Sequence, residues 1–521
     1  MRDDGAGHPA WVDASIGELV ASDGLFTDGD WVETKDQDPE GTVRLIQLAD
    51  IGDGNFLDKS ARFLTRAKAL ALNCTFLAKG DLLVARLAEP LGRCCIFPLD
   101  GDEEYVTVVD VCVVRLGTSA IDPKYVMYAI NGARTRADIE THRSGSTRKR
   151  VSRRNLARVT VPLAPGYEQR RIVAKIEELF SELDKGIESL KTARRQLEVY
   201  RQSVLKHAFE GKLTAQWREE NKDKLETPEQ LLVRIKKERV AHHEQQLAEW
   251  ESAVRVWETN GKPYMKPTKH RKPAGLAKLK SSELAELPLL PGGHVYTYLA
   301  HLGELERGKS KHRPRNAPEL FGGSYPFIQT GEVKAASRTI RHHSQTYSEL
   351  GLEQSRLWPE GTLCITIAAN IAETAFLGFD ACFPDSIVGF TATKTLVLPS
   401  YVHLFIQSFR ARIEAYAPAT AQKNINLNTL QKLVVPLCSL EEQQVLVDRL
   451  EVILSVADEQ ERDIDRALVE TEVLRQAILK KAFAGHLVAQ DPSDEPASVF
   501  LEKIKTERAQ AGKSNPTASS L

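Results

Sequence analysis

Apolar residues recur at alternating steps of three and four along residues 168–213, and this spacing predicts a long helix with a coiled-coil seam. The seam positions are Val173, Ile176, Phe180, Leu183, Ile187, Leu190, Leu197 and Val204. Arg194 and Arg201 interrupt this seam. A helix of about 40 residues would span about 60 Å at the usual rise per residue. Such a helix suits a spacer or an oligomerisation element.

The same run occurs a second time, without a gap, at residues 442–487. The matched segments are Val161-Pro162-Leu163 with Val435-Pro436-Leu437, Glu168-Gln169 with Glu442-Gln443, and Leu205-Lys206-x-Ala208-Phe209-x-Gly211-x-Leu213 with Leu479-Lys480-x-Ala482-Phe483-x-Gly485-x-Leu487. The second seam consists of Val447, Leu450, Leu454, Ala457, Ile464, Leu468 and Ile478. Glu461 stands where the first copy has Ile187, and Leu468 where it has Arg194. Because the seams differ in this way, we hypothesise that each prefers the other as its partner. A repeat of this length determines how the whole architecture is interpreted.

Each long helix follows a segment that the sequence predicts to be a mixed α/β domain. In the first, short apolar strands such as 43–48, 81–85 and 106–116 alternate with Gly and Asp turns, and residues 123–133 favour a helix. The second repeats this plan weakly, with Gln329 matching Gln47. We therefore expect an α/β (α+β) chain with an internal two-fold repeat. Its predicted parts are a first domain (1–165), a first helix (166–213), a charged helical segment with a Lys/Pro-rich linker (214–291), a second domain (292–439), a second helix (440–487), and a short helix with a disordered tail (488–521).

Composition narrows the class of protein. With 42% hydrophobic and 27% charged residues the chain has an ordinary globular composition, and it contains no apolar stretch long enough for a membrane span and no signal peptide. The cysteines lack a C-x-x-C pair, so neither a disulfide framework nor a zinc site is predicted, and a cytoplasmic location is expected. The formal net charge is -1, but basic residues cluster in two places, 143–158 and 307–315. Such patches are compatible with phosphate binding, although charged runs are more often simply solvated.

One segment matches a motif of nucleotide-binding enzymes. Residues 303–310, Gly-Glu-Leu-Glu-Arg-Gly-Lys-Ser, match the G-x-x-x-x-G-K-[ST] pattern of a phosphate-binding loop. Glu304 and Glu306 would place carboxylates beside the bound anion, and the prolines at 314 and 318 disfavour the helix that must follow. The chain also lacks a dinucleotide fingerprint, an H-E-x-x-H pair and any Pro-Pro dipeptide. We therefore predict neither a catalytic site nor a metal site in this chain.

The duplicated pattern closely resembles the DNA specificity subunit of type I restriction–modification systems over nearly the whole chain. The resemblance rests on Val-Pro-Leu, then Glu-Gln, then a long helix ending in Leu-Lys-x-Ala-Phe-x-Gly-x-Leu, present twice. The segment 302–310 also looks like that family's start of a recognition domain, which accounts for the apparent phosphate loop. The first domain departs from this pattern, because Ile16-Gly17-Glu18-Leu19 is not followed by Gly-Lys-Ser.

The resemblance implies that residues 1–165 and 292–439 are two target-recognition domains, each reading one half of a bipartite, asymmetric site in double-stranded DNA. The two long helices would pack antiparallel and fix the unread gap. The subunit itself would be non-catalytic and would bind no cofactor. Its partners would be two methyltransferase subunits, which use S-adenosylmethionine, and restriction (motor) subunits, which use ATP and Mg. The acidic faces of the long helices would be docking surfaces for the methyltransferase subunits.

Particular side chains are candidates for DNA contacts. Lys and Arg neutralise phosphates, and Gln or Asn can pair with adenine edges in the major groove. The candidate phosphate contacts are Arg148, Lys149, Arg150, Lys309, Lys311, Arg313 and Lys423. The candidate base contacts are Gln47, Gln329, Gln422 and Asn424. For each of these, ordinary surface polarity is the competing explanation. Two other classes of function remain open: a non-DNA structural adaptor with repeated protein-binding domains, and a nucleotide-binding enzyme that uses Lys309.

Overall fold

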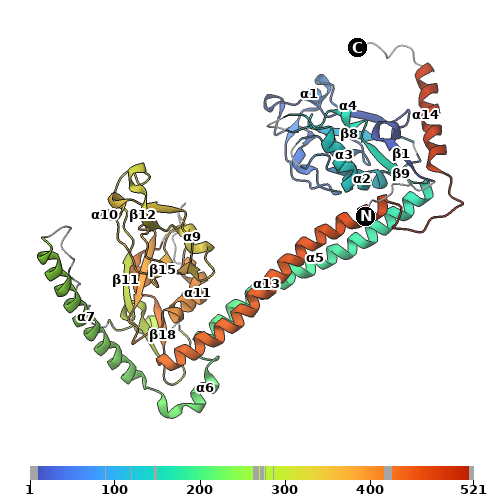
Figure 1. The fold of residues 1–521 in the computed structure, drawn as a ribbon. Coiled ribbons are helices and arrows are strands. Elements are labelled where there is room, and N and C mark those ends of the chain that lie inside the picture. Colours follow the sequence, from blue (N-terminus) through green and yellow to red (C-terminus); the bar gives the residue numbers. More distant parts are fainter. Residues whose placement is uncertain are drawn as a thin grey trace. The chain divides into compact units, whose positions relative to one another are not determined.

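The computed structural model describes residues 10–87, 90–101, 103–118, 120–145, 149–261, 269, 275, 277–285, 287–415 and 425–514. The chain forms two compact units, of which one comprises Met1–Thr192 with Ile464–Leu521 and the other Ala193–Asp463. Each unit holds one α/β domain together with part of each of two long helices (Figure 1). Among the described residues, no helix combines the length and apolarity that a membrane crossing requires.

The first domain is built around a four-stranded antiparallel sheet in the order β2-β8-β5-β6. A three-stranded sheet, β4-β3-β7, and an antiparallel pair, β1-β9, complete its strands. The elements are β1 (Val12–Ser15), β2 (Leu25–Asp28), β3 (Val43–Ile46), β4 (Phe63–Leu64), α1 (Arg66–Ala71), β5 (Leu82–Ala85), β6 (Cys94–Ile96), β7 (Glu104–Thr107), β8 (Val111–Arg115), α2 (Pro123–Asn131), α3 (Ala133–Thr141), α4 (Arg153–Leu156) and β9 (Thr160–Leu163).

The central strands of this sheet are buried on both faces. Side chains alternate between the two faces of a strand. Val111 and Val113 of β8 accordingly belong to one apolar cluster, with Phe97, whereas Cys112 and Val114 belong to another. This second cluster also contains the buried side of α2, so the helix covers one face of the sheet. Burial on both sides explains why these strands appear in the sequence as continuous apolar runs.

The second domain has a five-stranded sheet in the order β11-β17-β15-β16-β13, with the additional pairs β12-β14 and β10-β18. Its elements are β10 (Val295–Tyr298), β11 (Gly303–Arg307), β12 (Phe321–Phe327), α9 (Thr330–Ala335), β13 (Thr339–Ile340), β14 (Gln345–Tyr347), α10 (Glu349–Glu353), β15 (Leu363–Thr366), β16 (Thr374–Leu377), β17 (Ile387–Ala392), α11 (Pro399–Ala415), α12 (Leu427–Gln431) and β18 (Val434–Leu437). The β11-β17-β15-β16 order repeats β2-β8-β5-β6 of the first domain, so the predicted internal repeat is confirmed.

The repeat extends to individual hydrogen bonds. Tyr125 of α2 donates its hydroxyl to the carbonyl oxygen of Pro162 at 2.8 Å, and Tyr401 of α11 donates to that of Pro436 at 2.5 Å. Both tyrosines are buried, so each bond satisfies a polar group that would otherwise be costly in the core. Each one ties the sheet-covering helix to the strand that leads into a long helix.

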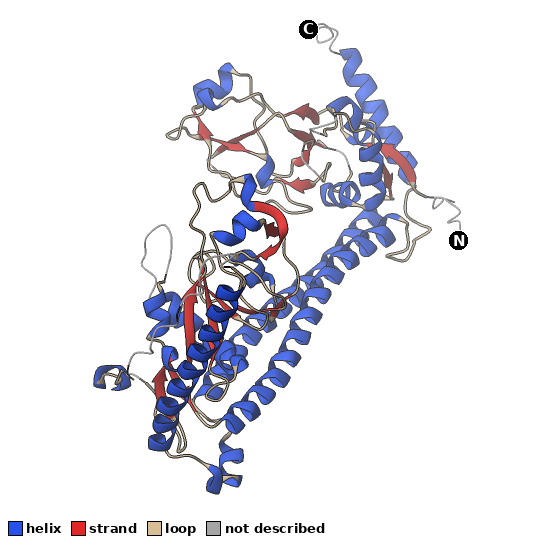
Figure 2. Cartoon of the chain, turned by 60° about the vertical axis from the view of Figure 1, so that its left-hand side comes forward, coloured by secondary structure: helices blue, strands red, loops and turns tan. Residues whose placement is uncertain are grey.

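The two long helices are α5 (Gly166–Phe209) and α13 (Leu440–Phe483), and they run antiparallel (Figures 1 and 2). In one unit Arg475 pairs with Asp184, and in the other Arg201 pairs with Asp458 at 2.7 Å. As the residue number rises along α5 from 184 to 201, the number of its partner on α13 falls from 475 to 458, as in an antiparallel pair. This confirms the predicted arrangement.

The polar residues that interrupt the two seams contact each other. Glu461 pairs with Arg194 at 3.5 Å and with Arg201 at 3.0 Å. Partly exposed ion pairs of this kind add little net stability. They can nevertheless help to specify partner and register, because a shift of one helix along the other would separate Glu461 from at least one of the two arginines. The contact supports the hypothesis that each seam prefers the other.

Further helices follow each long helix. After α5 come α6 (Ala215–Glu220), α7 (Pro228–Thr259) and α8 (Ser281–Ala285), and after α13 comes α14 (Ala497–Ser514). The α5 and α13 helices are both followed by a glycine with positive φ, +74° at Gly211 and +75° at Gly485, as expected for helix C-termini. The α14 helix packs on the first domain, where Arg508 donates to the carbonyl of Gly17 at 2.8 Å.

Gln443 provides a test of how the long helix is attached to the second domain. Its buried amide accepts from the Leu398 N–H at 2.9 Å and donates to the carbonyls of Leu396 and Cys438 at 3.1 and 3.0 Å. Gln443→Ala leaves these buried groups without partners, and we expect it to lower the free energy of unfolding by about 1–3 kcal/mol. Urea denaturation measures this loss. The neighbouring exposed Gln444 is the control: an equal loss in Gln444→Ala would contradict the assigned role.

Candidate nucleic-acid interface

The first domain contains a surface cavity of about 560 Å³ that brings together two of the predicted DNA contacts. Gln47 and Arg150, which are far apart in sequence, both line it, along with Trp31, Arg62 and Gln37. The cavity thus combines guanidinium groups, amides and an aromatic ring with the carboxyl groups of Asp30, Glu33 and Asp110. Guanidinium groups bind phosphates, amides bind base edges, and an apolar ring can contact a thymine methyl group.

Gln47 is held by the backbone at the end of β3. Its N–H donates to the carboxylate of Asp50 at 2.7 Å, and Asp50 also accepts from the N–H groups of Lys59 and Ser60 at 2.6 and 2.8 Å. Burial alone would raise the pKa of Asp50, but hydrogen bonds from Ser60, Gln47 and Lys59 outweigh it and lower that pKa. The ionised carboxylate therefore fixes the backbone from which the Gln47 side chain extends.

Arg150 belongs to the basic cluster at residues 143–158 and reaches the cavity from a strand-like segment. Its N–H donates to the carbonyl of Ser144 at 2.9 Å, the Ser144 N–H donates back at 2.8 Å, and Arg150 forms a β-bridge with Leu87. The Arg150 side chain is exposed, and that of Lys149 is half-buried. Arg148 lies outside the described residues, as do Gln422, Lys423 and Asn424.

Trp31 is a candidate that the sequence analysis missed. Its side chain is 70% exposed and donates its indole N–H to Glu33 at 3.2 Å. A large exposed aromatic surface in a polar cavity is uncommon on a protein surface and is typical of a binding site. A lone Trp between turn residues has no sequence signature that separates it from a core Trp, so only its exposure in the structure identifies it.

The second domain positions Gln329 as the first positions Gln47. The Gln329 N–H donates to the carboxylate of Glu332 at 3.1 Å, so both glutamines precede a short helix whose third residue is acidic. The Gln329 side chain is exposed and donates to the amide oxygen of Gln345 at 2.8 Å. The Gln329–Gln345 pair presents two adjacent amides on the surface. Their distance in the sequence gave no reason to expect this contact.

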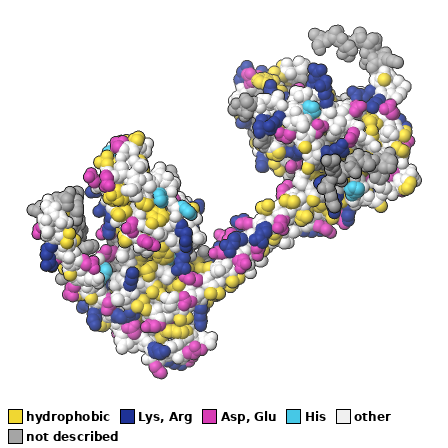
Figure 3. Space-filling view, in the orientation of Figure 1, with side chains coloured by type: hydrophobic (Ala, Val, Ile, Leu, Met, Phe, Trp, Pro, Cys, Tyr) yellow, Lys and Arg dark blue, Asp and Glu magenta, His cyan; other side chains and the backbone are white. Residues whose placement is uncertain are grey.

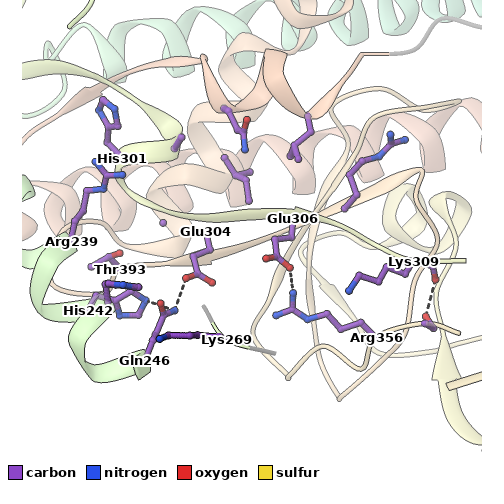
Figure 4. Close-up of a pocket in the computed structure, with 18 of the residues that line it drawn as sticks. Arg239, His242, Gln246, Lys269, His301, Glu304, Glu306, Lys309, Arg356 and Thr393 are labelled. Atoms are coloured by element: carbon purple, nitrogen blue, oxygen red, sulfur yellow. Dashed lines mark hydrogen bonds and ion pairs between the residues drawn. The ribbon is translucent and has the colours of Figure 1, made fainter. Parts of the chain in front are cut away.

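Lys309 and Lys311 line a larger cavity, of about 980 Å³, between α7 and β11 (Figure 4). The turn that carries them is anchored by Gln354, which accepts from the Lys311 N–H at 2.6 Å, and by Ser355, which donates to the Lys309 carbonyl at 2.9 Å. Arg313 is exposed but folds back onto the carbonyls of Ser310 and His312, and neither it nor Gln329 is among the lining residues.

The lining of this cavity is predominantly basic. Its charged residues are Arg239, Lys269, Glu304, Glu306, Arg307, Lys309, Lys311, Glu353 and Arg356. Two of the three carboxylates are engaged within the cavity, because Gln246 donates to Glu304 and Arg356 pairs with Glu306 (Figure 4). Arg356 also stacks on Trp358, 4.0 Å from the ring centroid. The cation excess suits a polyanion.

The structure excludes the geometry of a phosphate-binding loop at residues 303–310. Residues Gly303–Arg307 form β11, paired with β17, so this segment is a sheet strand and not a loop around a phosphate. Gly308 packs directly against the backbone segment that precedes β17. A Cβ added at Gly308 would lie 2.3 Å from the carbonyl oxygen of Phe383. A phosphate loop needs free N–H groups and a following helix, and the next helical segment is only the short 3₁₀ turn Pro318–Leu320.

Comparisons with known proteins show what the chain is similar to. Residues 299–468 match the family model described as the type I restriction modification DNA specificity domain. The chain is 24% identical over 416 residues to the type I restriction enzyme EcoBI specificity subunit of Escherichia coli, an alignment that covers 77% of this chain and 75% of that protein. It is also 24% identical to the EcoKI specificity subunit of Escherichia coli (strain K12), covering 68% of this chain and 65% of the relative.

The fold has a counterpart among solved structures. A chain from a study of complex assembly and conformational transition in a type I R-M system superposes with a TM-score of 0.61 at 17% identity, covering 92% of this chain and 99% of the other. That likeness concerns the fold. Residues 299–468 thus match the DNA specificity domain, and over most of its length the chain is similar to type I restriction enzyme specificity subunits.

Proposed function

We propose that this chain is the DNA-reading subunit of a type I restriction–modification complex, in which each α/β domain reads one half of a bipartite site. The observation that carries the proposal is that two domains of one topology present different polar groups. One presents the Trp31–Gln47–Arg150 cavity, and the other presents the Gln329–Gln345 pair and the Lys309–Lys311 cavity. Related scaffolds with different surfaces suit two different half-sites.

The long helices would set the unread gap between the half-sites. Half-sites read from one side of B-DNA lie about 34 Å apart, one helical turn. A helix of 44 residues is about 66 Å long at 1.5 Å per residue, which is ample for that span. The length of the paired helices, rather than any base contact, would then determine the spacing.

The same helices would dock the methyltransferase subunits. Basic and acidic side chains alternate along their surface (Figure 3), and α13 exposes Val452, Val469 and Val473 at 66%, 68% and 65%. Exposed branched apolar residues on a charged helix are typical of a protein interface. Catalysis would belong to those partners, with S-adenosylmethionine for methylation and ATP and Mg for the motor subunits, and this chain would supply only target recognition.

Mapping methylated adenines tests the proposal directly. Co-expression with the methyltransferase subunit from the same genome should produce methylation at one bipartite motif, and omission of this chain should abolish it. That result would also supply the target bases and the gap. Methylation that persists unchanged without this chain would contradict the proposal, and a complex without salt-sensitive DNA affinity would favour the adaptor function.

Neutralising basic residues tests the phosphate contacts. Lys149→Ala with Arg150→Ala should weaken binding to all DNA sequences and reduce the slope of log affinity against log salt by about 1–2, because each phosphate contact contributes about 0.9. Lys309→Ala with Lys311→Ala should do the same for the second domain. Lys503→Ala, which removes a lysine of α14 that pairs with Glu495, is the control. An unchanged salt slope would remove the altered segment from the interface.

Trp31→Ala tests whether the first cavity reads bases. Truncation of a Trp that anchors an interface typically costs about 2 kcal/mol or more, so methylation should relax at the half-site read by the first domain and stay unchanged at the other. Sequencing of methylated sites with each variant measures both halves at once. Trp217→Ala, on α6 outside both cavities, should leave both halves intact. Equal relaxation of both halves by Trp31→Ala would indicate a folding defect instead of lost recognition.

A further inference from the structure

Three potential metal ligands converge in the core of the second unit. They are His294, directly before β10, Cys438, directly after β18, and Glu442, in the first turn of α13. Their donor atoms all lie within 4.8 Å of one another, and all three residues are buried. The pairing of Val295 with Leu437 places the flanking His294 and Cys438 at the same end of the β10-β18 ribbon. The fold therefore assembles a site from residues that are distant in sequence.

The carboxylate of Glu442 is satisfied on one side only. Its Oε1 accepts from the Thr214 hydroxyl at 2.6 Å and from the Arg218 guanidinium at 2.6 Å. Its Oε2 is buried and has no hydrogen-bond partner among the described residues. A buried carboxylate oxygen without a partner is costly. Glu442 Oε2 can therefore accept one further electropositive partner, such as a metal ion.

The first half of the chain shows the same site in completed form. Trp11 precedes β1 as His294 precedes β10, Ala164 follows β9 as Cys438 follows β18, and Glu168 corresponds to Glu442. There the Trp11 indole donates to Oε2 of Glu168 at 2.9 Å, and Gln490 donates to Oε1. Both oxygens are satisfied without any metal ligand. In the second half, His294 and Cys438 stand in place of Trp11 and Ala164, and both can bind a metal. The Oε2 atom of Glu442 has no hydrogen-bond partner among the described residues.

The spacing of the donors fits ligands of a shared ion better than a hydrogen bond. His294 Nε2 lies 3.5 Å from Glu442 Oε1, whereas a hydrogen bond between charged N and O is about 2.7–2.9 Å long. The donor atoms of the three residues all lie within 4.8 Å of one another, so small side-chain shifts would bring them to the roughly 3.3–3.6 Å that separates two ligands of a tetrahedral ion. The other ring nitrogen, Nδ1, faces the Gly292 carbonyl at 3.5 Å. In metal sites, the histidine nitrogen that does not bind the metal usually donates to a carbonyl or carboxylate oxygen, which orients the ring.

We propose that His294, Cys438 and Glu442 bind one zinc ion. A set of one nitrogen, one sulfur and one carboxylate oxygen suits zinc and not magnesium or calcium, which prefer oxygen alone. On binding, the Cys438 thiol loses its proton to solvent and its sulfur bonds to the metal, His294 ligates as neutral imidazole, and Glu442 ligates through its carboxylate. Arg218 and Thr214 hold the other carboxylate oxygen in place. A water molecule completes the four ligands.

The bound ion would link the start of α13 to both strands of the β10-β18 ribbon. In the first half the Trp11–Glu168 hydrogen bond makes the corresponding link. The proposal does not depend on DNA recognition. It departs from the expectation that this chain holds no metal, which rested on the absence of C-x-x-C spacing.

Metal analysis of the full chain, free of any affinity tag and purified without chelator, tests the site. We expect about one zinc ion per chain by mass spectrometry of the metal, as for a structural zinc. Cys438→Ala and His294→Ala should each lose it, and Cys364→Ala, which changes an equally buried cysteine in β15, should retain it. Less than a tenth of an equivalent in the unaltered chain, or equal zinc in all variants, would overturn the proposal.

Cobalt substitution provides a second measurement that does not rely on a folded variant. After removal of zinc, Co²⁺ added to the unaltered chain should produce a thiolate-to-cobalt charge-transfer band and the visible absorption of a tetrahedral site. Removal of the metal should also lower the melting temperature, because an ion that binds only the folded state stabilises it. Co²⁺ spectra typical of octahedral, oxygen-only coordination would overturn the assignment of Cys438 as a ligand.

Discussion

The structure depends on a buried glutamate–glutamine pair at the start of each long helix. Gln169 accepts from the Asp122 N–H at 3.1 Å and donates to the Ala164 carbonyl at 2.8 Å, and Gln443 makes the matching bonds in the second half. Such bonds are short-ranged and directional, so they fix the angle at which a helix leaves its domain. Each α/β domain is thereby fixed to the helix start that follows it.

The glutamates of these pairs bind the chain that follows the opposite helix. Glu168 accepts from Gln490, beyond the end of α13, and Glu442 accepts from Thr214 and Arg218, beyond the end of α5. The end of one helix is thereby joined to the beginning of the other within each unit. Together with the Arg201–Glu461 contact along the helices, this defines the antiparallel register by polar contacts, while the apolar seam supplies the affinity between the helices.

Duplication left the scaffold intact while the exposed residues diverged. The conserved features are buried or bonded to backbone, such as the Tyr125 and Tyr401 hydroxyls. The divergent features are exposed, such as Trp31 in one domain and the Gln329–Gln345 pair in the other. Core positions are constrained by packing density, whereas surface positions tolerate change. The proposed reading of two unlike half-sites would therefore require changes to the surface alone.

The sequence by itself determined the repeat, the long helices, the two α/β domains and the family resemblance, because heptad spacing, helix-ending glycines and a duplicated motif are local patterns. It also identified Gln47 and Arg150 as separate candidates, but only the tertiary structure placed them in one cavity with Trp31. The structure likewise shows that most of the apparent phosphate loop is strand β11, and that His294 lies next to Cys438 and Glu442. These outcomes depend on strand pairing between distant segments, which local spacing does not encode.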